Sequence, residues 1–239
     1  MPPVRSLLHR YVPAQLHDPV GLAMRLLRTG DPAALFAMAT AAGGLAAAPL
    51  DMALALPERR LLAAADPTAP APPLIFVCGA PRSGTTVAYQ TLVNHLPVAY
   101  FSNLAALFPR APLTAQRLFG RMAGQAPVDY HSFYGRTRGL AGPNDALFLW
   151  DRWLGADRTA APAEPPSDRL DAMRRFFAAC AGQFQRPLAN KNNSLNLSAH
   201  WIAPALPQAT FICMTRERRQ LARSLYHARC DIHGSPQAA

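Results

Sequence analysis

Short apolar runs alternate with amphipathic segments along the last two thirds of the chain. The run Leu74 to Cys78 is continuous and apolar, which is typical of a strand buried on both faces. Further strands are predicted over residues 98–101, 187–191 and 210–215, and helices over 85–95, 113–122, 169–184, 194–206 and 217–229. Because the connections are too long for hairpins, the pattern predicts an α/β fold with a central parallel sheet flanked by helices.

The first part of the chain, residues 1–70, is predicted to be an N-terminal helical segment followed by a connector. Residues 18–63 have helical spacing, and the proline-rich stretch 66–73 cannot continue a helix. Residues 71–239 then form the main domain.

One N-terminal stretch needs a choice between a membrane span and a packed helix. Residues 32–50 carry no charge, which approaches the length of a transmembrane helix. The stretch is mostly alanine, however, and is interrupted by Gly43-Gly44 and closed by Pro49. We therefore expect a buried, alanine-rich pair of helices, no transmembrane segment and a cytoplasmic location.

Composition limits the partners. Half of the 239 residues are hydrophobic and 16% are charged, which permits a packed globule. The net charge of +10 comes almost entirely from arginine, since Lys191 is the only lysine, and it favours anionic partners. No basic run is interleaved with aromatic residues, so nucleic acid is not expected as a partner. The four cysteines form no CxxC pair and predict neither a zinc cluster nor a disulfide framework.

The strongest motif is Gly79-Ala-Pro-Arg-Ser-Gly-Thr-Thr86, placed between a predicted strand and a predicted helix. It fits the GxxxxGK[ST] phosphate loop except that Thr85 stands where the lysine belongs. That lysine reaches the β- and γ-phosphates, so this loop is poorly suited to a magnesium triphosphate. The glycines and the helix N-terminus still favour an anion, to which Arg82 can add a cation and Ser83 a hydroxyl.

Residues Pro81 to Thr86 resemble the 5′-phosphosulfate loop of sulfotransferases that use 3′-phosphoadenosine 5′-phosphosulfate (PAPS). The second signature of that family is a strand ending in arginine with a serine eight positions later, which Arg216 and Ser224 resemble. The resemblance implies that this pair binds the 3′-phosphate, and both residues would meet at one end of a parallel sheet. The family usually has Asp-Pro after the arginine, whereas this chain has Glu217-Arg218.

The resemblance covers about two thirds of the chain, from about residue 74 to 230, and its landmarks look like those of bacterial members of the family. It implies a P-loop-type three-layer fold. Family members continue well past the serine helix, so with fifteen residues after Ser224 we expect a domain that is incomplete at its C-terminus. Five further landmarks lie in the middle of the chain: residues 100–103, 135–139, 143–145, 150–153 and 191–193.

The implied reaction is transfer of a sulfuryl group from PAPS, as co-substrate and without a metal, to a hydroxyl or amine. The acceptor would be a small molecule, a carbohydrate or a lipid. The predicted nucleotide-binding residues are Gly79, Pro81, Arg82, Ser83, Gly84, Thr85, Thr86, Arg216, Ser224 and Lys191. Two other functions stay open: a P-loop nucleotide kinase-like enzyme, and a degenerate, non-catalytic nucleotide-binding protein.

Sulfuryl transfer needs a base for the acceptor proton and cations for charge on the bridging oxygen. Arg82 is the candidate cation. Asp145 is the first candidate for the base, because it stands where a Pro-x-Glu element is expected, and His131 and Asp129 are alternatives. Lys191 either approaches the nucleotide or is an ordinary charge at the end of a strand.

Overall fold

The computed structural model describes residues 19–124, 130–155, 161 and 163–235. Four strands form one sheet in the order β2-β3-β1-β4, and every neighbouring pair is parallel. The strands are β1 (Leu74–Gly79), β2 (Ala99–Tyr100), β3 (Leu188–Lys191) and β4 (Ala209–Met214). Leu74 at the start of β1 pairs with Leu188 on one side and Ala209 on the other. The α/β prediction with a central parallel sheet is confirmed.

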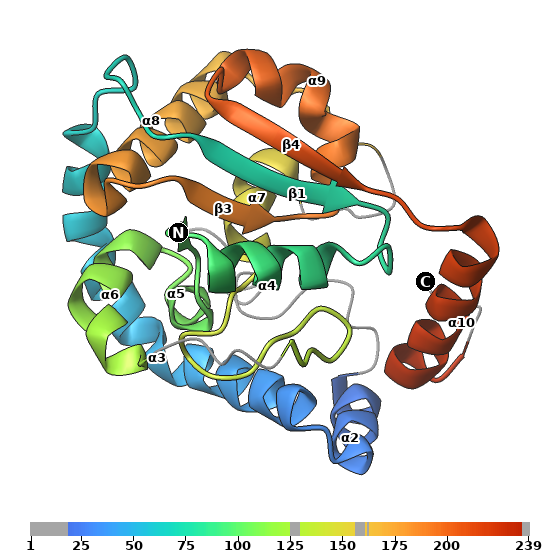
Figure 1. The fold of residues 1–239 in the computed structure, drawn as a ribbon. Coiled ribbons are helices and arrows are strands. Elements are labelled where there is room, and N and C mark those ends of the chain that lie inside the picture. The colour runs from blue at the N-terminus through green and yellow to red at the C-terminus, as the bar shows by residue number, and fades with distance from the viewer. Residues whose placement is uncertain (1–18, 125–129, 156–160, 162, 236–239) are drawn as a thin grey trace.

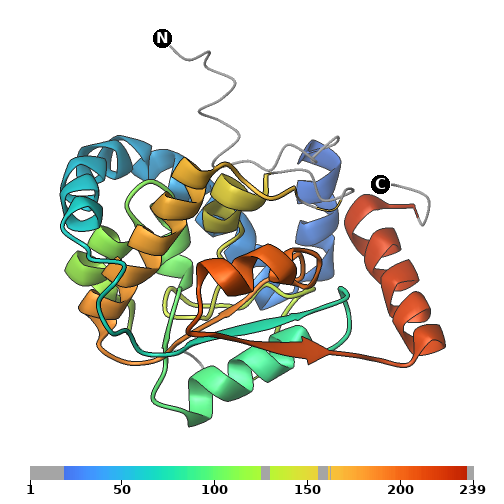
Figure 2. The same ribbon diagram turned by 90° about the horizontal axis from the view of Figure 1, so that it is seen from above.

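Helices cover both faces of this sheet. Helix α4 (Thr85–His95) lies on one face, and α7 (Leu147–Leu154), α8 (Ser167–Phe184) and α9 (Leu195–Ala205) lie on the other (Figures 1 and 2). The remaining described elements are α2 (Pro19–Thr29), α3 (Pro32–Ala63), α5 (Asn103–Leu107), α6 (Pro112–Phe119), the 3₁₀ helix η1 (Gly120–Ala123) and α10 (Arg218–His233). Because connections between parallel strands pass over the sheet, this three-layer arrangement follows from the strand order.

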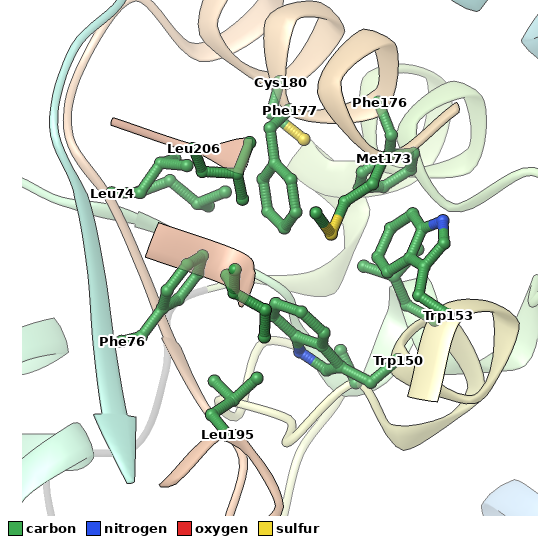
Figure 3. Close-up of a cluster of buried hydrophobic side chains, with 14 of the residues drawn as sticks. Leu74, Phe76, Trp150, Trp153, Met173, Phe176, Phe177, Cys180, Leu195 and Leu206 are labelled. Carbon is green, nitrogen blue, oxygen red and sulfur yellow. The ribbon is translucent and has the colours of Figure 1, made fainter. Parts of the chain in front are cut away.

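Packing in the hydrophobic core fixes the position of the C-terminal end of β1. Phe76 is fully buried and its ring lies 5.3 Å from that of Trp150 and 5.7 Å from that of Phe177. Figure 3 shows these rings packed between the sheet and the helices above it. The next residue, Val77, points to the opposite face and packs with Tyr89 of α4. With both faces filled, β1 delivers Gly79 and the following loop to a fixed position.

The prediction of a buried helix pair over residues 32–50 is wrong. Residues 32–63 form one continuous helix, α3, which contains both Pro49 and Pro57. Pro49 removes the hydrogen bond to the carbonyl of Leu45 and crowds that carbonyl, but Leu45 lies on an exposed part of the helix. Gly43 lies against Leu107 of α5, where a Cβ would be 3.7 Å from its side chain. That distance is an ordinary van der Waals contact, and the helix continues through Gly43 and Gly44.

By length and composition, α3 is the one helix among the described residues that could cross a membrane, and most of its apolar window is exposed. Its second half is nevertheless tied to the domain by two buried acids. Asp51 accepts hydrogen bonds from the backbone of Arg110 and Ala111, and Glu58 accepts them from Leu113 and Thr114. These N–H groups lie just before α6 or in its first turn, where donors lack partners within the helix. Both acids thus cap α6 from another helix.

Candidate functional site

The loop from Gly79 to Thr86 joins β1 to α4 with an unusual backbone. Gly79 has φ +141°, and a Cβ there would clash with the carbonyl oxygen of Met214 in β4. Gly84 has φ +97° at the N-cap of α4, and Arg82 adopts φ +72°, which is rare for a residue other than glycine. Strained backbone of this kind concentrates at ligand sites.

The loop also presents donors that suit an anion. Gly84 provides no side-chain cap for α4, so the positive end of that helix faces the loop. The Ser83 hydroxyl is buried and has no hydrogen-bond partner within the protein. A buried polar atom without a partner is uncommon, and a phosphate or sulfuryl oxygen would satisfy it. These features suit an anionic group such as a phosphate.

The second phosphate motif meets the first at the carboxyl edge of the sheet. Strands β1 and β4 are neighbours, and each is followed by an arginine-bearing segment. The Arg82 Nε donates to Ser224 Oγ at 3.0 Å, and Arg216 Nη1 donates to the Arg82 carbonyl at 3.1 Å. The Arg82 guanidinium also lies over the ring of Tyr134, 4.9 Å from its centroid. Two cations and a hydroxyl far apart in sequence therefore converge on one place.

Glu217, the departure from the usual Asp-Pro, has a structural role. Its carboxylate accepts hydrogen bonds from the backbone N–H groups of Arg219 and Gln220, both at 2.8 Å. These two hydrogen bonds, that from Arg219 first, lower the pKa of Glu217 below its ordinary value. Glu217 is thus the N-cap of α10, the helix that carries Ser224, and keeps that helix starting directly after Arg216.

Lys191 links the loop to Asp145. The lysine is buried at the end of β3, where its Nζ lies 2.5 Å from Asp145 Oδ2 and 3.3 Å from Thr86 Oγ1. Gly135 approaches so closely that a Cβ there would lie 3.4 Å from the lysine nitrogen. Thr85, where the phosphate loop of nucleotide triphosphatases has its lysine, is buried and donates to Asn193 at 3.2 Å. The only lysine in the chain therefore enters the site from β3.

A chain of amides fixes the backbone on which Asp145 sits. Asn144 donates to the side chain of Asn103 at 2.8 Å, while its carbonyl accepts from Asn190 at 3.2 Å. Asn190 in turn accepts from the indole of Trp150 at 2.6 Å. Because Asn190 lies in β3 and Trp150 in α7, the network sets Asp145 against the sheet edge. Such buried networks hold a side chain in one geometry.

A pocket of about 1000 Å³ opens beside these groups. Gly79, Asp145 and Lys191 line one part of it, and residues of α2 and α3 line another. The landmarks at 135–139, 143–145 and 191–193 all contribute to its wall. Its size is at the upper end of the range for small-molecule sites.

The other candidates for the base are placed differently. His131 is exposed, and its Nε2 lies 3.1 Å from Asp31, the N-cap of α3. It does not line the pocket. Asp129 lies outside the described residues. Among the residues that the structure describes, no group of three or more His, Cys, Asp or Glu is placed to hold a metal ion. The base and metal predictions stay predictions.

Sequence reasoning missed several residues of the site. Tyr134 faces Arg82 and also donates through its hydroxyl to Asp231 of α10, while Arg136 lines the pocket. Desolvation, followed by the neighbouring Asp231 carboxylate, raises the pKa of Tyr134 to about 12. The Gly135 to Gly139 landmark lies directly after Tyr134 and could have pointed to it. Nothing in the sequence indicated that α2 and α3 wall the pocket.

Comparison with known proteins identifies the family to which the chain belongs. The model of the family described as "Sulfotransferase family" matches residues 73–235, which is well over half of the chain. Searches of curated proteins and of solved structures returned no match. The matched range begins just before β1 and ends just after α10, so it contains the whole sheet and both phosphate motifs. This chain belongs to the sulfotransferase family.

Proposed function

We propose that this sulfotransferase takes its sulfuryl group from PAPS and transfers it, in the cytoplasm, to a hydroxyl or amine acceptor. The observation that carries the proposal is the convergence of Arg82, Arg216 and Ser224 at the shared edge of β1 and β4. PAPS carries two separate anionic groups, a 3′-phosphate and a 5′-phosphosulfate. Arg82 with the phosphate loop and Arg216 with Ser224 form two adjoining groups of cations and hydroxyl donors, which suit the two anionic groups of PAPS.

Some of these residues would bind the nucleotide, and others would act in the transfer of the sulfuryl group. Ser83, Thr86 and the N-terminus of α4 would bind the 5′-phosphosulfate, and Arg216 with Ser224 would bind the 3′-phosphate. The acceptor oxygen attacks sulfur, the bond from sulfur to the bridging oxygen breaks, and that oxygen keeps the electron pair. Arg82 and Lys191 stabilise the charge that develops there. The acceptor proton passes to the carboxylate of Asp145.

Lys191 and Asp145 suit these paired roles because they contact each other on the pocket wall. A cation beside the departing oxygen and an anion beside the acceptor hydroxyl match the charge movement of the reaction. Both residues are held in place. Lys191 is held by β3, and Asp145 is held by the amide network that precedes α7. Such preorganisation means that little free energy is spent on orienting them during transfer.

Isothermal titration tests the nucleotide. We expect 3′-phosphoadenosine 5′-phosphate, the product nucleotide, to bind about ten- to a hundredfold more tightly than adenosine 5′-monophosphate, which lacks the 3′-phosphate. Tighter binding of ATP-Mg than of the product nucleotide would instead favour a kinase-like enzyme.

Labelled PAPS tests the reaction. Transfer of ³⁵S to any member of a mixed panel of phenols, sugars and lipid alcohols is the expected result. If the product nucleotide binds and raises the melting temperature, yet no member of the panel is sulfated, the chain is a nucleotide-binding protein without this activity.

A further inference from the structure

The pocket has two chemically different ends. Its polar end consists of the start of the phosphate loop, the Lys191–Asp145 pair, Arg136 and the amides of residues 192–193. Its other end is mainly apolar and is formed by α2, α3, α5, α7 and α9, of which α5 and α9 also contribute Asn103 and Asn196 to the pocket wall. The side chains there are those of Leu22, Leu26, Phe36, Ala37, Met38, Ala41, Ala106, Leu107, Leu147, Phe148 and Leu197. All the residues contributed by α2 and α3 are uncharged, and Thr40 is their one hydroxyl.

The pocket touches only the start of the phosphate loop. It borders the loop through Gly79, Ala80 and Pro81, whereas Arg216 and Ser224 are not among its lining residues. The groups assigned to the 3′-phosphate therefore belong to a separate surface. A molecule in this pocket would place one end beside Asp145 and would fill the remaining space against the helices.

The charges at the polar end favour one type of head group. Arg136 and Lys191 are cations that line the pocket, and Asp145 is the one acid in its lining. This excess of positive charge would repel an ammonium group, whereas it would not repel a neutral hydroxyl. A hydroxyl can also donate its proton directly to the Asp145 carboxylate.

We infer that the acceptor is an amphiphile with a hydroxyl head and an aliphatic body, and that α2 and α3 select it by its apolar part. This inference rests on the proposed PAPS-dependent function and narrows its acceptor. The hydroxyl oxygen forms the new bond to sulfur, its proton passes to Asp145, and the nucleotide departs with the bridging oxygen and its electron pair. The aliphatic body stays in the α2–α3 end of the pocket throughout.

A homologous series of primary n-alkanols, from butanol to decanol, tests the inference with ³⁵S-labelled PAPS. Each methylene that enters an apolar pocket raises kcat/KM by about three- to fourfold. We therefore expect a steady rise with chain length until the apolar end is filled, followed by a plateau. The n-alkylamines of equal length are expected to be poorer acceptors.

Two matched variants of α3 locate the effect. Ala37 is half-buried and lines the pocket, whereas Ala39, on the same helix, is exposed and does not. Ala37→Phe should lower kcat/KM for decanol by at least about tenfold, the equivalent of two methylenes excluded, and should lower it less for butanol, which fills less of the pocket. Ala39→Phe should leave both unchanged. Binding of 3′-phosphoadenosine 5′-phosphate and the melting temperature check that each variant is folded.

Direct binding of the alkanols, measured calorimetrically with the product nucleotide present, gives a readout that does not need turnover. Affinity that rises with chain length and falls in Ala37→Phe supports the inference even where transfer is slow. Transfer or binding that is independent of chain length overturns it and leaves the proposed function standing. Failure of the product nucleotide to bind overturns the proposed function instead, and the alkanol binding series still tests the pocket.

Discussion

The phosphate edge, made of residues 79–86 and 216–224, and helix α3 are built by opposite means. At the phosphate edge, strained backbone and charged hydrogen bonds hold a few polar groups at the ends of two neighbouring strands. Helix α3 is long and alanine-rich, exposes several large apolar side chains, and is anchored by two buried acids. Under the proposed function the two regions have separate tasks: the first would fix the chemistry of the transferred group, and the second would shape the space for the acceptor.

The largest expected effect is loss of turnover on removing Asp145, the proposed base. Asp145→Asn keeps a hydrogen-bonding side chain beside Lys191 but cannot take a proton, so kcat should fall by about 10²- to 10⁴-fold. Affinity for the product nucleotide, measured by titration, should change little because Asp145 lies on the acceptor side. His131→Gln is the matched control and should retain kcat. The reverse outcome, a fall only in His131→Gln, would assign the base to His131, which lies beside Asp31 at the start of α3.

Substitution of a buried acid in helix α3 should instead lower the free energy of unfolding. Glu58 is 1% exposed and accepts from Thr114 N at 2.7 Å, from Thr114 Oγ1 at 2.6 Å and from Leu113 N at 3.3 Å. Glu58→Ala strands these donors in the interior, so the free energy of unfolding should fall by about 3 kcal/mol. Urea denaturation measures this loss.

The control for Glu58 lies on the same helix. Leu56 is 55% exposed, and Leu56→Ala should change the free energy of unfolding by less than about 0.5 kcal/mol. Equal losses in the two variants would mean that α3 is held by its apolar contacts and that the buried carboxylate adds nothing.

At the phosphate edge, single arginines should affect binding and not stability. Arg82→Ala and Arg216→Ala should each weaken the product nucleotide by roughly 1.5 to 3 kcal/mol, the scale of charged hydrogen bonds. Arg216→Ala should also reduce the preference for the product nucleotide over adenosine 5′-monophosphate. Arg219→Ala removes an exposed arginine of α10, and it should leave the affinity for the product nucleotide and the preference over adenosine 5′-monophosphate unchanged. Losses of equal size in Arg219→Ala would show that net charge, and no defined site, attracts the nucleotide.

The same contrast explains what the sequence could predict. The four strands and the helices α4, α6, α8, α9 and α10 were readable from the alternation of apolar runs and amphipathic segments, whereas α5 and α7 were not predicted. The loop was predicted from its glycine spacing next to a strand end, and the Arg216–Ser224 pair from its resemblance to the second signature of the sulfotransferase family. The structure then brought Arg82 within 3.0 Å of Ser224 because β1 and β4 are neighbours, which spacing alone could not establish.

Features that depend on contacts between distant segments could not be predicted. The single helix over residues 32–63 continues past Pro49 because Asp51 and Glu58 find partners near residues 110–114, more than fifty positions away. Tyr134 carries no motif of its own and enters the site through a backbone with φ +48° followed by Gly135. The apolar end of the pocket combines five helices, each of which alone is an ordinary amphipathic or alanine-rich segment.

The smallest expected effect is at the start of α3, where Asp31 accepts from Ala33 N at 2.8 Å and lies beside His131. Desolvation raises the pKa of Asp31, but hydrogen bonds from His131, Ala34 and Ala33 outweigh it and lower the pKa below its ordinary 3.8. A carboxyl with a lowered folded-state pKa stabilises the fold above its unfolded-state pKa, and this contribution is lost as pH falls through the folded-state pKa.

Asp31→Ala should therefore cost about 1 kcal/mol of stability at neutral pH, the usual value of an N-cap. The difference from the wild type should shrink below about pH 4, as the carboxyl takes up its proton. Asp31→Asn keeps a capping oxygen and should lose only a few tenths of a kcal/mol. Chemical denaturation of the three proteins from pH 7 to pH 3 checks this order. A deficit in Asp31→Ala that does not change with pH would mean that the cap acts without its charge, and α3 would then depend on Asp51 and Glu58 for its electrostatic anchoring.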